Sequence, residues 1–561
     1  MTGESDGETT DFAITWGNNF ADDKGNVTVH LSYSEEKEIP MTARSYAVRD
    51  PSFLPNPVNT GPDDGIADAN GNPVCRSGNI ACVPYNPINN LASPEALSYA
   101  SVVLIRTDEI KQTVASFSFN GDLFEMPAGM VAFAAGLEYR DEKSKSTPDP
   151  LTQAIDPDGV GSGLVGSTTG ASRSENSFVL PTRGDYKVKE VFFESIFPLL
   201  IDQGIESLDF EVAARYSDYN TTGGDSTYKS ALNLTINEMI RTRVTYSLAV
   251  RAPNVQELFS PQQIQGRFVT VPCDANNLNS GPNPANRQSN CAALGIADDF
   301  QSEAAFGSRN VITQGNLELI PEEATTLTAG FVFTPFDALS VAVDYWDIEI
   351  EDAITSFDST DILNNCVDSS SLNAEFCGLI ARDNSGQINS IAVKSINAAK
   401  FNANGVDLDV FYRHGLDNST LNFSFQGTYL DERKFQQNSE NPEDINSQAG
   451  QVATPHFRAL INSVYSIDNI STAWTINYIG ESTFNKVAQP EQYPDWFNNK
   501  VKAYTYHSLN FSYEYNDDYR FYLGIDNVLD KEPPNLPGLN AGGLLYDGIG
   551  RKYYAGVRIS L

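Results

Sequence analysis

Apolar and polar residues alternate along segments of about 8 to 12 residues from roughly residue 113 onward. A period of two residues is the signature of a β-strand with one apolar and one polar face. The pattern is clearest in the segments 208–215, 244–251, 339–346, 421–429 and 553–561. Aromatic residues lie near the ends of the apolar faces, where the interface girdles of a membrane barrel would be. The pattern predicts an all-β protein.

The connections between these segments alternate between two sizes. Short turns fall at 122–129, 202–206, 237–239, 335–338, 415–418, 466–470 and 516–518. Long polar loops fall at 142–184, 253–323, 354–393, 431–455, 480–502 and 533–551. A tandem array of soluble sandwich domains has no reason to sort its loops by length, whereas an outer-membrane barrel has short periplasmic turns and long extracellular loops. We therefore predict a transmembrane antiparallel β-barrel.

Matching to the two-residue period gives roughly 17 strands, an odd number in which the first and last strands run the same way. Closure would then need a parallel seam between the terminal strands, or else the sheet would keep exposed edges, which are unfavourable in lipid.

Composition narrows the class of protein further. The 561 residues carry 37 Lys and Arg against 73 Asp and Glu, a net charge of -36. Phosphate binding needs cationic side chains, so this balance argues against a nucleic-acid partner and against a basic membrane-surface helix. Mean hydropathy is -0.31, and no window reaches the ~18 consecutive apolar residues of a spanning helix. A barrel is compatible with both values because its lumen is polar.

Six cysteines fall in three close pairs, each in a loop rich in Asn, Asp, Ser, Pro or Gly. The pairs are Cys75 with Cys82, Cys273 with Cys291, and Cys366 with Cys377. Such pairs predict disulfides and an oxidising compartment. A zinc site is the competing interpretation, but there is no CxxC spacing and no histidine near the cysteines. The first ten residues contain no secretory signal and would by themselves indicate the cytoplasm.

Several motifs resemble the TonB-dependent outer-membrane receptors. They are RAPNVQELF at 251–259, GNLELIPE at 315–322, YSDYN at 216–220, GVDLD at 405–409, DNVLD at 526–530 and the closing RKYYAGVRISL. The resemblance extends over nearly the whole chain. It implies a barrel of about 22 strands around a plug, preceded by a box that contacts a periplasmic energy-transducing protein. It also implies uptake of a scarce, bulky nutrient of the ferric siderophore, haem, cobalamin or oligosaccharide class.

The motif at the base of one long loop comprises Arg251, Ala252, Pro253 and Glu257. Proline cannot donate to a strand ladder, so Ala252 and Pro253 mark the point where pairing stops. We expect Arg251 and Glu257 to form an ion pair there; direct ligand contact is the alternative.

The apolar positions Tyr553, Val557, Ile559 and Leu561 of the last strand resemble the family's assembly signal, which implies contact with the outer-membrane assembly machinery. The family signal ends in an aromatic residue, and Leu561 departs from it. The alternative is simply a last barrel strand.

The resemblance also predicts what the chain lacks. Residues 1–10 resemble the remnant of an extracellular loop, and residues 11–561 resemble the barrel. Nothing in the sequence resembles the plug, and the spacing between 33 and 112 is short for the family. We therefore expect a plug-less part of a receptor.

Candidate ligand sites are few. The loop 61–73 contains several Asp and Asn residues that could hold Ca²⁺, but it fails the EF-hand pattern and has the ordinary composition of turns. Tyr493 and Trp496 lie in a long loop, where they could stack on a ligand or pack on the barrel rim. The charged residues Glu211, Arg215, Asp344 and Arg558 are expected on a mutually paired lumen wall.

No catalytic motif is present: GxSxG at a strand-to-helix turn, HExxH and the phosphate loop are all absent from the sequence. We therefore expect a receptor in the outer membrane of a Gram-negative bacterium and no enzyme. The alternatives are an ungated porin and a secreted β-rich glycan-binding protein.

Solubility separates the membrane proteins from the secreted one. We expect the purified chain to need detergent, because its outward face is apolar. A folded, monodisperse species in detergent-free buffer, measured by size-exclusion chromatography, would leave only the secreted protein.

Overall fold

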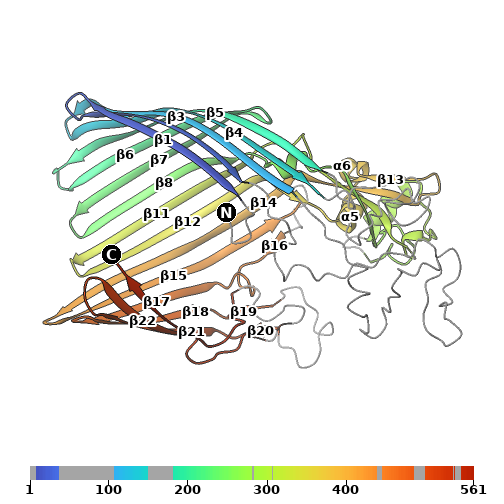
Figure 1. Ribbon diagram of the computed structural model, residues 1–561. Coiled ribbons are helices and arrows are strands. Elements are labelled where there is room, and N and C mark those ends of the chain that lie inside the picture. Colours follow the sequence, from blue (N-terminus) through green and yellow to red (C-terminus); the bar gives the residue numbers. More distant parts are fainter. Residues whose placement is uncertain are drawn as a thin grey trace, which may run out of the picture.

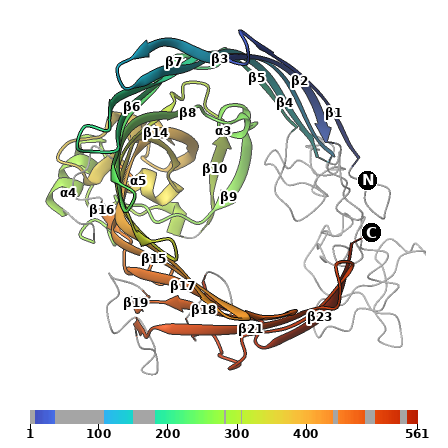
Figure 2. The ribbon, with the colours of Figure 1, turned by 90° about the vertical axis from the view of Figure 1, so that its left-hand side faces the viewer.

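The computed structural model describes residues 8–36, 107–148, 181–280, 284–305, 307–438, 445–484, 499–534, 536 and 545–560. Most of these residues lie in β-strands that tilt side by side around a central lumen (Figures 1 and 2). Of the helices in these ranges, none has the length and apolar character needed to cross a membrane.

Seventeen long strands form the wall in the described part of the chain. They are β1 (Thr9–Phe20), β2 (Gly25–Glu36), β3 (Thr107–Met126), β4 (Gly129–Thr147), β5 (Thr182–Ile201), β6 (Ser207–Tyr219), β7 (Gly223–Asn237), β8 (Ile240–Arg251), β11 (Glu322–Phe336), β12 (Leu339–Ser356), β14 (Ile388–Leu416), β15 (Ser419–Gln436), β17 (Phe457–Ile467), β18 (Ile470–Ile479), β21 (Tyr504–Glu514), β22 (Tyr519–Asp526) and β23 (Lys552–Ile559). The antiparallel barrel architecture and the number of strands agree with the sequence prediction.

Six shorter strands and five short helices lie at the end of the wall that carries the long loops. They are β9 (Gln263–Arg267), β10 (Arg309–Gln314), β13 (Ile380–Arg382), β16 (Ile445–Ser447), β19 (Ser482–Thr483), β20 (Lys500–Val501), α3 (Val255–Phe259), α4 (Pro284–Ala293), the 3-10 helix η3 (Glu303–Ala305), α5 (Ser359–Asp368) and α6 (Ala374–Gly378).

Neighbouring wall strands pair antiparallel at every step from β1 to β23. With an odd number of strands, β1 and β23 therefore run in the same direction. Among the described residues, β1 pairs only with β2, and β23 pairs only with β22. Of the two arrangements that the sequence left open, the described wall has the one with two unpaired edges.

Because neighbouring strands pair in register, alternating residues form apolar rows and polar rows that run across the wall. One row is apolar and largely exposed: Trp16, Val29, Phe117, Leu137, Val191 and Tyr216. The row beside it is polar: Thr15, His30, Ser116, Glu138, Glu190, Ser217 and Asp225. Members of the polar row line a concavity of about 500 Å³. Apolar rows therefore face outward and polar rows face the lumen.

Short and long connections lie at opposite ends of the wall (Figure 1). The short turns often place Asp in the left-handed region, as at Asp202 (φ 53°) and Asp468 (φ 46°), which this residue tolerates better than most. Strands extend further than alternation predicts: β3 continues to Met126, inside the turn expected at 122–129, and β14 begins at Ile388, inside the loop expected at 354–393. Backbone pairing in these strands therefore continues past the segments in which apolar and polar residues alternate.

Gly330 in β11 lets an ion pair form across an intervening strand on the lumen face. Arg243 of β8 and Asp344 of β12 lie on either side of it in the register. The Arg243 guanidinium donates from Nε at 3.0 Å and from Nη2 at 2.6 Å to Oδ1 of Asp344. A Cβ at position 330 would lie 2.3 Å from that oxygen and 2.8 Å from the Arg243 Nε.

We expect Gly330→Ala to destabilise the wall by about 1–3 kcal/mol, because the added methyl overpacks the ion pair. Gly415→Ala is the matched control, since nothing lies within 4 Å of a Cβ at that strand position. Thermal unfolding in detergent measures both. Equal midpoints for the two variants would contradict the role assigned to Gly330.

Candidate functional site

Two long connections fold together at the loop end of the wall into one compact unit, which we call the cap. It consists of the described residues of 252–321 and 357–396. Its core includes Val271, Leu278, Ile362, Leu363 and Phe376, each no more than 4% exposed. The helices α4, α5 and α6 and the strands β9, β10 and β13 belong to this unit (Figures 1 and 2). The cap therefore has a hydrophobic core of its own.

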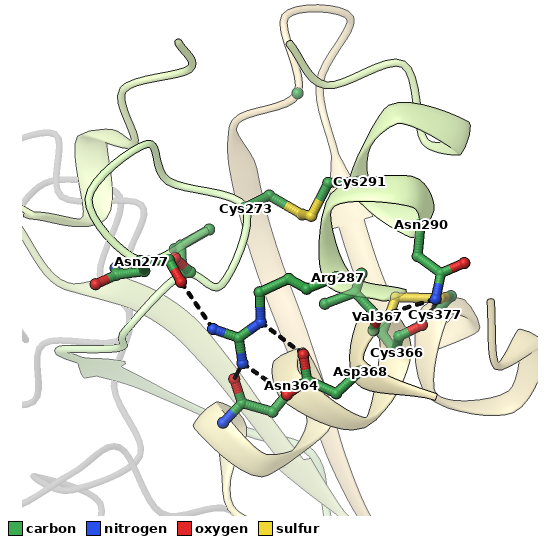
Figure 3. The surroundings of a disulfide bond; sticks show 12 residues. Cys273, Asn277, Arg287, Asn290, Cys291, Asn364, Cys366, Val367, Asp368 and Cys377 are labelled. Carbon is green, nitrogen blue, oxygen red and sulfur yellow. Dashed lines mark hydrogen bonds and ion pairs between the residues drawn. A yellow bond between two sulfur atoms is a disulfide. The ribbon is translucent and has the colours of Figure 1, made fainter. Parts of the chain in front are cut away.

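Two disulfides staple the cap. Cys273 bonds to Cys291 and Cys366 bonds to Cys377, with the partners that the sequence predicted (Figure 3). Cys273, Cys291 and Cys366 are almost completely buried, so these bridges belong to the core. The third predicted pair, Cys75 and Cys82, lies outside the described residues.

A buried arginine joins the two connections that make up the cap. Arg287 of α4, 4% exposed, donates from Nε and Nη2 to the two carboxylate oxygens of Asp368 in α5, each at 2.6 Å (Figure 3). It also donates to the Asn277 carbonyl at 2.9 Å and to Asn364 Oδ1 at 3.2 Å. Sequence reasoning missed this network, because Asn364 and Asp368 are 77 and 81 positions from Arg287 and none of these residues lies in a recognisable motif.

A second buried charge organises the loop that follows Cys273. Asp274, 3% exposed, accepts from the Ser302 amide at 2.7 Å through Oδ2. Its Oδ1 accepts from the backbone and side-chain nitrogens of Asn276 at 2.9 and 3.0 Å. Burial by itself raises the pKa of Asp274, but the hydrogen bonds from Ser302 and Asn276 lower the pKa further than burial raises it. The net pKa is below the ordinary value.

The cap and the wall share one continuous strand. β14 begins in the cap, where Ser390–Lys394 pair in parallel with β10, and its later residues pair with β12 and β15 in the wall. A β-strand is stiff over this length because each residue is held by its ladder. The cap is thereby fixed to the wall.

The predicted ion pair at the loop base is present within a larger network. Arg251 donates from Nε to Glu322 at 2.5 Å and from Nη2 to the other oxygen of the same carboxylate at 2.8 Å. It also donates from Nη1 to Glu257 at 3.1 Å. Glu322 in turn accepts from the Ile354 amide at 2.6 Å. One guanidinium thus ties the ends of β8 and β11 to α3 and to the end of β12.

Asn254 and Glu257 form a reciprocal capping box on α3, and Ala252 and Pro253 provide the short unpaired approach to it. The helix packs on β5: a Cβ at Gly184 would lie 2.4 Å from the Phe259 ring. Figure 2 shows α3, β9 and β10 inside the outline of the strand ring. The loop-base motif thus turns the chain inward from β8 over the mouth of the lumen.

Most of the predicted wall charges form pairs across strands. Arg215 lies 3.3 Å from Glu190, which also accepts from Ser217 at 2.5 Å. Lys229 lies 2.5 Å from Glu211, and Asp344 pairs with Arg243 as described above. Arg558 differs, since its neighbour in the register is Arg520.

The motif DNVLD closes a second loop cluster beside β21. Asn527, 3% exposed, donates to the Lys531 carbonyl at 3.0 Å and to Asp547 Oδ2 at 3.1 Å. Around it, Tyr506, Leu536 and Tyr546 belong to a small core with Ile479. The motif DNVLD therefore stabilises the fold of this loop cluster.

The remaining predicted site residues divide into two groups. Tyr553, Val557 and Ile559 lie on the exposed outer face of β23. Leu561, Tyr493, Trp496 and the calcium candidate loop 61–73 lie outside the described residues. The assembly and ligand roles assigned to these residues stay predictions.

The sequence matches the family described as "TonB dependent receptor-like, beta-barrel" over residues 3–528. The chain belongs to this family. TonB-dependent receptors are outer-membrane receptors and transporters and do not form an enzyme class. No protein among those with curated functions matches the sequence.

Solved structures of siderophore receptors share the fold of this TonB-dependent receptor chain. PirA of Acinetobacter baumannii is 16% identical with a TM-score of 0.56, and the match covers 99% of this chain and 62% of that one. A variant of the ferric enterobactin receptor PfeA of Pseudomonas aeruginosa, in complex with enterobactin, is 13% identical with a TM-score of 0.57, covering 98% and 62%. The ferripyoverdine receptor of Pseudomonas aeruginosa, bound to ferripyoverdine, is 12% identical with a TM-score of 0.51, covering 93% and 52%. The chain thus spans less than two thirds of the length of these receptors.

We expect Arg287→Ala to destabilise the cap by about 3–5 kcal/mol, because it leaves the Asp368 carboxylate buried and unpaired. Replacing both partners, as Arg287→Met with Asp368→Leu, should recover most of that loss. The rate of limited proteolysis within the cap reports its opening.

Lys394→Ala is the control for this pair, since Lys394 meets the largely exposed Glu318 at 3.4 Å and its loss should cost at most about 1 kcal/mol. If the double variant were no more stable than Arg287→Ala, an unpaired, buried Asp368 carboxylate would not be the cause of the destabilisation.

The depressed pKa of Asp274 makes cap stability depend on pH. Its contribution is fully present above the unfolded-state pKa of about 4 and is lost as the pH falls through the lower folded-state value. We expect Asp274→Asn to weaken the cap at neutral pH and to reduce the acid sensitivity of its proteolysis below about pH 4. An unchanged acid response would show that other carboxylates control opening.

Proposed function

We propose that this chain supplies the barrel wall and the extracellular cap of an outer-membrane receptor for ferric siderophores. The observation that carries this proposal is a rigid cap that extends inward over the lumen mouth of a TonB-dependent receptor barrel. Structural similarity to receptors named for siderophores, enterobactin and ferripyoverdine supports the choice of cargo.

In this role the cap holds the cargo at the mouth and the polar lumen wall lines the route inward. The family match supports coupling to a periplasmic energy-transducing protein through a plug. The paired charges of the wall, such as Arg215 with Glu190, give the lumen a hydrated surface with little unbalanced charge at those positions. A wall of this kind accommodates a plug or a passing solute without strong binding to either.

Residues 1–10 were expected to be the remnant of an extracellular loop. Thr9 and Thr10 belong to strand β1 instead, so the proposal now covers residues 1–8. Thr9 and Thr10, together with residues 11–561, are proposed as the barrel portion. The plug, the lipid contacts and the assembly machinery are proposed partners.

We expect the purified chain in detergent to bind ⁵⁵Fe-labelled ferric siderophores with a dissociation constant in the micromolar range or tighter, measured by equilibrium dialysis. Haem, cobalamin and a maltooligosaccharide are the competing cargoes. Binding of one of these in place of every ferric siderophore would reassign the cargo. If none binds while liposomes containing the chain swell in sugar solutions, the chain acts as an ungated porin instead.

A further inference from the structure

Phe268 is the most exposed of the large apolar side chains in the described residues, at 82%. It follows β9 directly and lies on the cap. Wall residues such as Trp16 are exposed because they belong to the outward apolar face, whereas Phe268 is outside the wall strands. Its exposure therefore needs a different explanation from the apolar face of the barrel.

A pocket of about 450 Å³ opens beside Phe268. Its apolar lining comes from Val269, Val271 and Ala304, which are 8%, 2% and 3% exposed. Asn276 and Asn277 also line it. An aromatic ring, an apolar floor and a few amides in a pocket of this size are typical of a small-molecule site. We call it the Phe268 pocket.

The walls of the pocket are fixed by cap interactions already described. Asn277 donates from Nδ2 to the Val271 carbonyl at 3.0 Å, and its own carbonyl accepts from Arg287. The Cys273–Cys291 bridge holds the same loop to α4. A ligand entering the pocket would thus meet preformed surfaces and lose little free energy in ordering them.

The charges around the pocket disfavour an anion. No Lys or Arg is among its described lining residues, and the one charged lining residue, Asp274, already has hydrogen bonds to both carboxylate oxygens. The cap sequence has eleven acidic and five basic residues, a net charge of -6. Among the basic residues, Arg287, Arg309 and Lys394 each have a carboxylate partner. The negative electrostatic potential of the cap would therefore repel an anionic group.

We propose that the Phe268 pocket is a cargo subsite that takes an uncharged, planar ring group. The inference rests on the proposed function for the identity of the whole cargo, and it names the part of the cargo that the cap contacts. Phe268 would stack on the ring while Asn276 and Asn277 offer amide donors and acceptors to its substituents. The pocket thus selects against ferric chelates whose rings carry negative charge.

Three ferric complexes separate the effect of a ring from the effect of charge. Ferric tris(benzohydroxamate) is neutral and has rings, ferric tris(acetohydroxamate) is neutral without rings, and the ferric complex of a linked tris-catecholate has rings but is trianionic. Binding to the full chain in detergent is measured with excess free hydroxamate. Benzohydroxamic acid without iron is a fourth probe.

We expect the wild-type chain to bind the neutral ring complex about tenfold more tightly than the neutral complex without rings. Phe268→Ala should remove this difference, and Phe268→Tyr should retain it. The matched control is Ile549→Ala, because Ile549 is 81% exposed in a loop outside the cap. Circular dichroism and cap proteolysis confirm that each variant is folded.

Equal affinities of wild-type and Phe268→Ala chains for the ring complex would overturn the subsite, as would tightest binding of the trianion. Weak trianion binding that strengthens with salt would support the charge argument, since salt screens repulsion. If benzohydroxamic acid alone binds in a Phe268-dependent way and no iron complex binds better, the subsite stands while the siderophore proposal fails.

Discussion

Sideways pairing of backbone groups is the constraint on which the rest of this structure depends. From β2 to β22, each wall strand satisfies its N–H and C=O groups through its two neighbours, and in lipid no water can replace a missing neighbour. Antiparallel pairing also assigns each residue to one of two faces, so that one register decides both the apolar exterior and the polar lumen. The row from Trp16 to Tyr216 and the row from Thr15 to Asp225 are consequences of the same ladder. The ion pair across Gly330 follows from it as well, because the register brings Arg243 and Asp344 level.

The cap is stabilised by different interactions from those of the wall. Its strands and helices are short, and it is held by a small core, two disulfides and the buried contact between Arg287 and Asp368. These features are typical of a small domain that cannot bury enough apolar surface by itself. The loop-base network of Arg251 then links this domain to the wall at the point where ladder pairing ends. A rigid cap on a rigid wall provides preformed surfaces at the lumen mouth.

The sequence predicted the wall well and the cap poorly, for physical reasons. Alternation is a local pattern with a period fixed by the strand, so the number and order of wall strands could be read from it. The cysteine pairs were also readable, because their partners are 18 and 11 residues apart. The Arg287–Asp368 contact was not, because it joins separate connections and neither residue lies in a recognisable motif. Phe268 was missed for a related reason: an aromatic residue in a loop reveals nothing about its exposure until the loop around it is folded.

The length of β14 has a consequence for where the cap stands. Its 29 residues extend about 95 Å at roughly 3.3 Å per residue. At a tilt of about 45°, that corresponds to about 65 Å along the membrane normal, against an apolar band of about 25 Å. If the short turns lie at the inner surface, the far end of β14 rises tens of ångströms above the outer one. In that orientation the cap would stand beyond the lipid headgroups, where it would meet a solute in open water before the solute reaches the membrane.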